Sequence, residues 1–199
     1  DPDMIKWHKE HKVLSKLNNY SFDNKKVNVL NQDAISFMRD TKEKYDIVII
    51  DLVDPTDIQI GRLYSTLMYQ GVKSVLKPNG LFTTQSTSSY YTQKTFLSIK
   101  KTIESVGFNT LSTQINVPSF GQWGFNIGSL IYSEKELKNK LRQDINQNYK
   151  KQLKYVNEDI LHSITAFDKN YYKNYDDIEI STQFNLKSSY YYNEQNKRY

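Results

Sequence analysis

The chain has no cysteine and only three histidines among its 199 residues. The absence of cysteine excludes disulfides, thiolate zinc sites and cysteine nucleophiles, and it is typical of proteins in a reducing compartment such as the cytoplasm. The three histidines, His8, His11 and His162, leave little material for a metal site built on imidazoles. We therefore expect a protein without a bound metal.

Long hydrophobic runs are also missing. The longest wholly aliphatic stretch is Ile47 to Ile50, far below the roughly 20 residues that a membrane-spanning helix needs. No signal peptide opens the chain, so the sequence predicts a cytoplasmic protein. The chain begins at Asp1 rather than at a methionine, and we expect residues upstream of it.

The net charge of +5 is unevenly distributed along the chain. Residues 134–154 hold seven basic side chains against three acidic ones, whereas residues 45–60 hold four aspartates and no base. No binding motif of alternating aromatic and basic residues accompanies the basic stretch, so we interpret it as a solvated helix face and expect no nucleic-acid binding. The acidic stretch would repel phosphates and attract a cation.

Helices and strands alternate in the pattern of apolar residues. Helices are predicted over residues 4–17, 33–39, 63–76 and 92–106, and strands over 27–30, 45–50, 81–87, 109–117 and 123–132. Residues 45–50 carry no polar side chain after Asp46, which favours a strand covered on both faces in a parallel sheet. Pro78 and Gly80 are expected to end the third helix.

This alternation predicts an α/β domain with a mostly parallel sheet and a terminal antiparallel hairpin. We expect the domain to cover residues 1–133. Residues 134–199 are richer in charged residues, Asn and Tyr, and they are interpreted as a helical and irregular C-terminal appendage of the same domain.

Polar side chains follow four of the predicted strands, namely Asp33, the pair Asp51 and Asp54, Gln85, and residues 119–122. Ligands of open α/β sheets bind outside the carboxyl ends of the strands, so these groups are expected to converge at one edge. Singly, each fits an ordinary role as a helix cap, a turn residue or an exposed amide. Together they indicate a ligand-binding site at this edge of the sheet.

Motifs for other chemistries are absent from these residues, including a glycine-rich phosphate loop, a serine elbow, a zinc-binding histidine pair and a Walker lysine. The groups that remain are carboxylates, amides and aromatic rings. Carboxylates beside an aromatic cleft can hold an ammonium group and accept its proton, which makes the amine a nucleophile. Such a site needs a substrate that brings its own electrophile, for example a sulfonium.

Five motifs in this order resemble those of the polyamine aminopropyltransferases, the spermidine synthase family. They are DPDM at 1–4, NQDAISF at 31–37, YDIVIIDLVDP at 45–55 followed by LYS at 63–65, VPSFGQWGFNIGS at 117–129, and LKYVNEDILHSITAF at 153–167. The resemblance implies a Rossmann-like class I methyltransferase fold.

The DLVDP and VPSFGQWGF motifs are most similar to the long bacterial form of the family, in which a membrane-spanning region precedes the enzyme domain. Neither that region nor the family's GGGDG loop is present in this chain. The resemblance therefore implies that one or more N-terminal strands are missing, and that any membrane contact runs through the missing region.

The resemblance also assigns roles to single residues. It implies that Asp51 deprotonates the attacking amine, that Asp54 anchors the polyamine, and that Gln85 lies at the amine site. Asp33 and the backbone of Ala34 are similar to the family's adenine contact.

Phe120 is expected at the substrate site, where short-form relatives have a tyrosine. The hydroxyl that helps to orient the amine in those relatives is therefore absent at this position.

The activity implied is transfer of the aminopropyl group of decarboxylated S-adenosylmethionine to an amine such as putrescine, which gives spermidine and methylthioadenosine. The partners would be small-molecule polyamine and nucleoside substrates, with no tightly bound cofactor. Relatives are usually dimers, so the resemblance implies a homodimer by analogy.

Two alternatives stay open. One is a small-molecule methyltransferase of the same fold that uses S-adenosylmethionine itself, and the other is a polyamine- or nucleoside-binding domain without catalysis. The acid pair around Leu52 and Val53 and the hairpin motif favour amine transfer. A third alternative, a nucleic-acid binder, rests on the net charge alone.

Overall fold

A computed structural model describes residues 1–143 and 152–197 of the chain. The chain divides into two compact units, residues 1–40 and residues 41–199, and each is described by itself. None of the described helices combines the length and the apolar composition that a bilayer crossing demands.

The first unit is helical. It contains α1 (Pro2–Glu10), α2 (Lys12–Leu17), the 3-10 helix η1 (Ser21–Asp23) and α3 (Ala34–Asp40). The Oδ1 atom of Asp33 accepts a hydrogen bond of 2.7 Å from the backbone N–H of Ser36. The predicted capping role of Asp33 is thereby confirmed.

Two expectations for this unit are wrong. The helix predicted over residues 4–17 is broken, because His11 has an extended backbone with φ −77° and ψ 118° between α1 and α2. The strand predicted over residues 27–30 is irregular backbone, with Val27 and Leu30 44% and 55% exposed. A strand needs a neighbour to complete its hydrogen bonds, and none of the described strands pairs with these residues.

The second unit is built on a four-stranded sheet with the order β1, β2, β4, β3. The strands are β1 (Tyr45–Ile50), β2 (Leu76–Gln85), β3 (Asn109–Val117) and β4 (Gly121–Ser129). β1 and β2 are parallel, whereas β4 runs antiparallel to both β2 and β3. The α/β class and the terminal hairpin are confirmed. The expectation of a mostly parallel sheet is wrong for the described strands, because β1 with β2 is parallel while the other two pairings are antiparallel.

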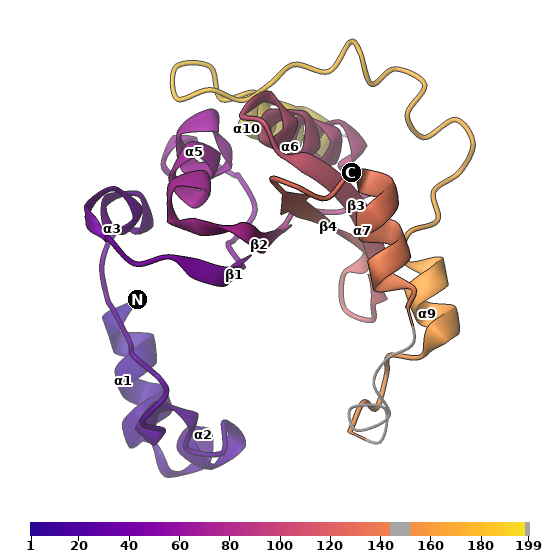
Figure 1. The fold of residues 1–199 in the computed structure, drawn as a ribbon. Coiled ribbons are helices and arrows are strands. Elements are labelled where there is room, and N and C mark those ends of the chain that lie inside the picture. The colour runs from indigo at the N-terminus through magenta and orange to yellow at the C-terminus, as the bar shows by residue number, and fades with distance from the viewer. Residues whose placement is uncertain (144–151, 198–199) are drawn as a thin grey trace. The chain divides into compact units, whose positions relative to one another are not determined.

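Helices α5 (Thr66–Val75), α6 (Gln93–Ser105) and α10 (Lys187–Asn196) lie on one side of this sheet (Figure 1). Two short helical turns, α4 (Ile58–Gly61) and η2 (Arg62–Tyr64), precede α5, and α7 (Glu134–Leu141) and α9 (Glu158–Ser163) follow β4. The core between helices and sheet includes the fully buried side chains of Tyr64, Tyr69, Val72, Phe82, Phe96, Ile99 and Ile103.

The prediction for the segment around Pro78 is wrong in one respect. Helix α5 ends at Val75, and the sequence KPNG lies inside β2 instead of terminating the helix. Gly80 makes this pairing feasible, because a Cβ atom there would lie 2.9 Å from the backbone oxygen of Tyr45 on β1. The register of β1 with β2 shifts here, from Tyr45–Leu76 to Ile47–Leu81, so Pro and Gly mark an irregularity inside the strand.

The expectation that β1 is covered on both faces is also wrong for the described residues. Ile47 and Ile49 are 66% and 73% exposed, whereas Ile50 is buried. Alternate side chains of a strand point to opposite faces. One face of β1 is therefore packed, and the face that carries Ile47 and Ile49 is open.

The basic stretch that begins at residue 134 forms a solvated helix, as predicted. Leu137 is the buried residue of α7, and Ser133 and Glu136 form a capping box at its start. Residues 144–151 of the same stretch lie outside the described part of the chain.

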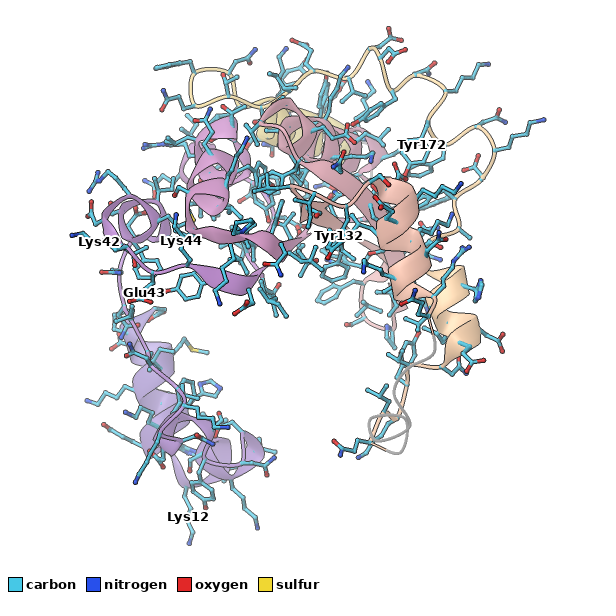
Figure 2. All side chains as sticks on the ribbon, in the orientation of Figure 1. Lys12, Lys42, Glu43, Lys44, Tyr132 and Tyr172 are labelled. Atoms are coloured by element: carbon cyan, nitrogen blue, oxygen red, sulfur yellow. The ribbon has the colours of Figure 1, made fainter. Side chains whose placement is uncertain are left out.

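The C-terminal segment packs along α6. Tyr171, Ile178 and Tyr191 share one buried cluster with Phe96 and Leu97 of that helix. The neighbouring Tyr172 lies at the surface, 36% exposed (Figure 2). This packing joins the segment to the second unit, while the boundary between residues 133 and 134 stays a prediction.

Candidate functional site

The centre of the candidate site is the carboxylate of Asp54, which lies in the loop after β1. Gln85 ends β2, the parallel neighbour of β1. Its Nε2 atom donates a hydrogen bond of 2.7 Å to Oδ1 of Asp54. The expected meeting of these two residues at the carboxyl edge of the sheet is therefore observed.

The amide of Gln85 is fixed from both sides. The side chain is buried, with 6% of its surface exposed. Its Oε1 atom accepts a hydrogen bond of 2.8 Å from the backbone N–H of Thr87. This bond orients the amide, so the donating Nε2 atom faces the carboxylate.

Tyr64 contacts the loop that follows β1 through its hydroxyl group. Its hydroxyl donates a hydrogen bond of 2.9 Å to the backbone oxygen of Val53 and lies 3.4 Å from Oε1 of Gln85. Burial raises the pKa of Tyr64 well above its ordinary value, and nearby negative charges, among them Asp54 and Asp51, act in the same direction. Tyr64 therefore stays a neutral donor beside the acidic loop.

The second carboxylate oxygen of Asp54 is held by the C-terminal helix. The hydroxyl of Tyr192 on α10 donates a hydrogen bond of 2.8 Å to Oδ2 of Asp54. Both oxygens thus have a neutral donor, and each keeps a lone pair for a cation.

A cavity of about 300 Å³ opens beside this carboxylate. Its lining residues are Asp54, Ser88, Tyr91, Thr92, Phe120, Trp123, Tyr192 and Asn196. The rings of Phe120 and Trp123 lie 5.1 Å apart between their centroids. A cavity with aromatic walls and one carboxylate suits an alkyl chain that ends in an ammonium group.

Asp51 occupies a different position. It lies at the start of the same loop, is exposed, and does not belong to the residues that line the cavity. The described part of the chain offers its carboxylate no hydrogen-bond donor. Asp51 is therefore free to interact with a bound group, and its predicted role as a base stays a prediction.

Asp33 and Ala34 belong to the first unit, at the start of α3. The capping bond to Ser36 accounts for one oxygen of Asp33. The predicted adenine contact of these two residues stays a prediction.

Within residues 1–143 and 152–197, no three His, Asp or Glu side chains come together as a metal site would require.

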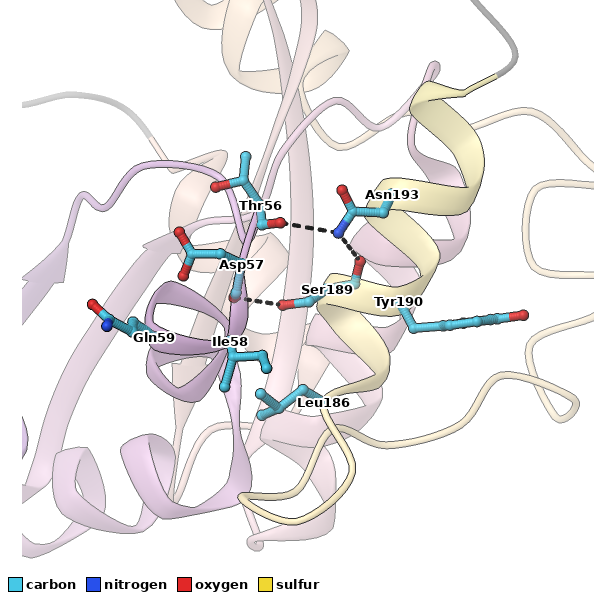
Figure 3. A pocket seen from close by; sticks show the side chains of 8 residues that line it. All are labelled: Thr56, Asp57, Ile58, Gln59, Leu186, Ser189, Tyr190 and Asn193. Carbon is cyan, nitrogen blue, oxygen red and sulfur yellow. Dashed lines mark hydrogen bonds between the residues drawn. The ribbon is translucent and has the colours of Figure 1, made fainter.

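A second cavity, of about 680 Å³, lies between α4 and α10. It is lined by Thr56, Asp57, Ile58, Gln59, Leu186, Ser189, Tyr190 and Asn193 (Figure 3). Asp57 caps α4 here through a hydrogen bond of 2.9 Å from the backbone N–H of Ile60. None of the predicted site residues lines this cavity.

Four aromatic residues of the site, Tyr64, Tyr91, Trp123 and Tyr192, had no predicted role in the sequence. Tyr64 belongs to the LYS motif and Trp123 to the hairpin motif, so the motifs themselves indicated that these two residues lie near the site. Tyr192 is one of three consecutive tyrosines, and their spacing alone does not indicate which of them reaches the site.

Residues 1–143 match the family model of the spermine/spermidine synthase domain. The chain belongs to this family. A polyamine aminopropyltransferase 2 of Aquifex aeolicus is 41% identical over 143 residues, which are 70% of this chain and 29% of the relative. A polyamine aminopropyltransferase 1 of Streptomyces coelicolor is 42% identical over 125 residues, 63% of this chain and 24% of the relative. The chain thus spans less than a third of the length of these relatives.

Two solved structures show the fold of this spermine/spermidine synthase family member. The spermidine synthase of Thermotoga maritima superposes with a TM-score of 0.69 at 22% identity, covering 88% of this chain and 58% of that one. A spermidine synthase in complex with the transition-state analogue AdoDATO gives 0.64 at 23% identity, covering 84% and 59%. The match to the family model ends at residue 143, so α9 and α10 lie beyond it.

Proposed function

We propose that the protein transfers the aminopropyl group of decarboxylated S-adenosylmethionine to an amine such as putrescine. The observation that carries this proposal is the Asp54 carboxylate, which Gln85 and Tyr192 hold at the wall of an aromatic cavity. Family membership supports the donor, because the relatives are named polyamine aminopropyltransferases.

The reaction is a single in-line displacement. The lone pair of the amine attacks the aminopropyl carbon next to the sulfonium, a C–N bond forms, and the C–S bond breaks with its electrons moving to sulfur. Methylthioadenosine leaves, and the new ammonium loses one proton. Most of the rate would come from positioning of the two substrates.

The two aspartates have separate roles in this scheme. Asp54 holds the distal ammonium of the diamine, because a buried cation needs a paired anion. Asp51 is exposed and without a donor among the described residues, and it accepts the proton of the attacking amine or fixes the neutral amine.

The setting of the reaction is part of the proposal. The substrates are a small polyamine and a nucleoside, no tightly bound cofactor or metal takes part, and the enzyme acts in the cytoplasm as a homodimer. We expect no binding of nucleic acid, because the aspartates of the site would repel its phosphates.

The test compares two donors with purified full-length protein. With decarboxylated S-adenosylmethionine and putrescine we expect release of methylthioadenosine. With S-adenosylmethionine as donor we expect no methylated amine. Methyl transfer without release of methylthioadenosine would make the protein a methyltransferase, and binding of putrescine without either product would make it a binding domain.

A further inference from the structure

Helix α10 is anchored to the loop that follows β1. The Nδ2 atom of Asn193 donates a hydrogen bond of 3.0 Å to the backbone oxygen of Thr56, and Oγ of Ser189 donates one of 3.2 Å to the backbone oxygen of Asp57. Figure 3 shows both side chains directed at this loop, whereas Tyr190 points away from it. Helix α10 therefore contacts the aspartate-rich loop that also carries Asp54.

The same helix reaches the first cavity with another set of side chains. Tyr192 and Asn196, one helical turn apart, both line the cavity beside Asp54. The hydroxyl of Tyr192 donates its hydrogen bond of 2.8 Å directly to Asp54. One hydrogen bond thus joins α10 directly to the carboxylate.

The hydroxyl of Tyr192 is a stable donor. Burial raises the pKa of Tyr192 to about 12, and the hydrogen bond to Asp54 acts in the same direction. The phenol therefore keeps its proton across the physiological range and neutralises no charge at the carboxylate. Phe120, which also lines the cavity, has no hydroxyl to donate.

We propose that Tyr192 is a positioning residue for the amine acceptor, which orients Asp54 toward the distal ammonium and forms one wall of the amine cavity. This inference rests on the proposed aminopropyl transfer. It extends the site beyond the residues matched by the family model, because α10 lies after residue 143.

The expected effect follows from where Tyr192 acts. Asp54 holds the end of the amine that does not react, so it contributes equally to the bound substrate and to the transition state. Loss of such an interaction raises KM and leaves kcat nearly unchanged. A hydrogen bond to a charged group is strong enough for a change in KM of about tenfold.

The experiment compares Tyr192→Phe with Tyr190→Phe in the full-length protein. Each variant loses one hydroxyl from the same helix, but Tyr190 is 60% exposed and directed away from the loop. For Tyr192→Phe we expect KM for putrescine to rise about tenfold with kcat within about twofold of wild type. Tyr190→Phe should match the wild type in both constants.

A double-mutant cycle separates positioning from general destabilisation. In an Asp54→Asn background, Tyr192→Phe should change KM by less than about twofold, because the partner carboxylate is gone. Thermal unfolding of each variant reports whether α10 stays folded.

Three results would overturn the inference while wild-type transfer is intact. They are an unchanged KM in Tyr192→Phe, an equal effect of Tyr190→Phe, or full additivity with Asp54→Asn. Absence of transfer by the wild-type protein would instead refute the proposed function, so the two failures are distinguishable.

Discussion

The carboxylate of Asp54 is held by side chains from two distant segments of the chain. Its two carboxylate oxygens accept hydrogen bonds of 2.7 and 2.8 Å from Gln85 and Tyr192. Neutral donors on both oxygens orient an acid without cancelling its charge. A carboxylate prepared in this way can bind a cation without reorganising, which is what recognition of a flexible diamine requires.

One of these two contacts was predictable from the sequence and the other was not. Asp54 and Gln85 follow parallel neighbouring strands, so their meeting at one edge follows from strand order alone. Tyr192 lies 138 residues beyond Asp54. Three consecutive tyrosines on a helix point in three directions, and only the docking of α10 decides which of them reaches the site.

The pKa of Tyr192 gives a prediction for alkaline pH. Burial raises this pKa to about 12, above the value of about 10 for an unfolded chain. Below pH 10 the hydroxyl is protonated in both states, and its contribution to stability is complete. As the pH rises from about 10 to 12, the unfolded state loses the proton first, and this contribution declines.

Urea unfolding of the wild type and Tyr192→Phe at pH 9 and at higher pH tests this point. The difference in free energy of unfolding between the two proteins should shrink as the pH rises from about 10 toward 12. Other buried tyrosines are common to both proteins and cancel in the difference. A difference that stays constant over this range would contradict the assignment.

At the scale of elements, the contact between α4 and α10 holds the C-terminal helix on the site. Gly61 ends α4, and a Cβ atom there would lie 2.1 Å from Oγ and 3.2 Å from Cβ of Ser189. Only a residue without a side chain allows this approach.

Gly61→Ala should therefore push α10 away from α4. We expect the free energy of unfolding to fall by about 1–3 kcal/mol, the usual cost of overpacking. Adding Ser189→Ala removes the closest atom and should recover part of the loss, while Ser189→Ala alone serves as the control. Urea unfolding measures all three variants, and an unchanged stability of Gly61→Ala would contradict the close packing.

The elements themselves were predicted where local pattern and tertiary packing agree. The strand over residues 109–117 has the predicted bounds, and α6 lies within the predicted range of 92–106. The prediction of secondary structure failed where contacts with residues distant in the sequence determine the conformation. The KPNG sequence has the composition of a turn, and the structure places it inside β2 as an irregularity, where the register with β1 jumps from Tyr45–Leu76 to Ile47–Leu81.

At the scale of the whole molecule, the C-terminal segment completes the packing of the second unit. Tyr171, Ile178 and Tyr191 cover Phe96 and Leu97 of α6. Further hydrogen bonds join the two, including those of 2.8 Å from Ser98 to Glu179 and from Ser181 to Thr102. The charge and composition of residues 134–199 predicted an appendage, but they gave no information on which helix it covers.

A chain that ends at Gln143 should lose this cover. Removal of several buried side chains costs a few kcal/mol in stability, and we expect the melting temperature to fall by about 10 °C or more. Phe184→Ala in the intact protein is the control, because this ring is 90% exposed. A truncated protein that melts within about 2 °C of the intact one would contradict the account.

The measurement that tests the central claim most directly is the joint formation of spermidine and methylthioadenosine from decarboxylated S-adenosylmethionine and putrescine, compared between wild type and Asp51→Asn. A general base contributes about 100-fold or more to a rate. We predict equal amounts of both products from the wild-type full-length protein and a kcat at least about 100-fold lower for Asp51→Asn. Wild-type rates in Asp51→Asn, or no spermidine from the wild type, would contradict the claim.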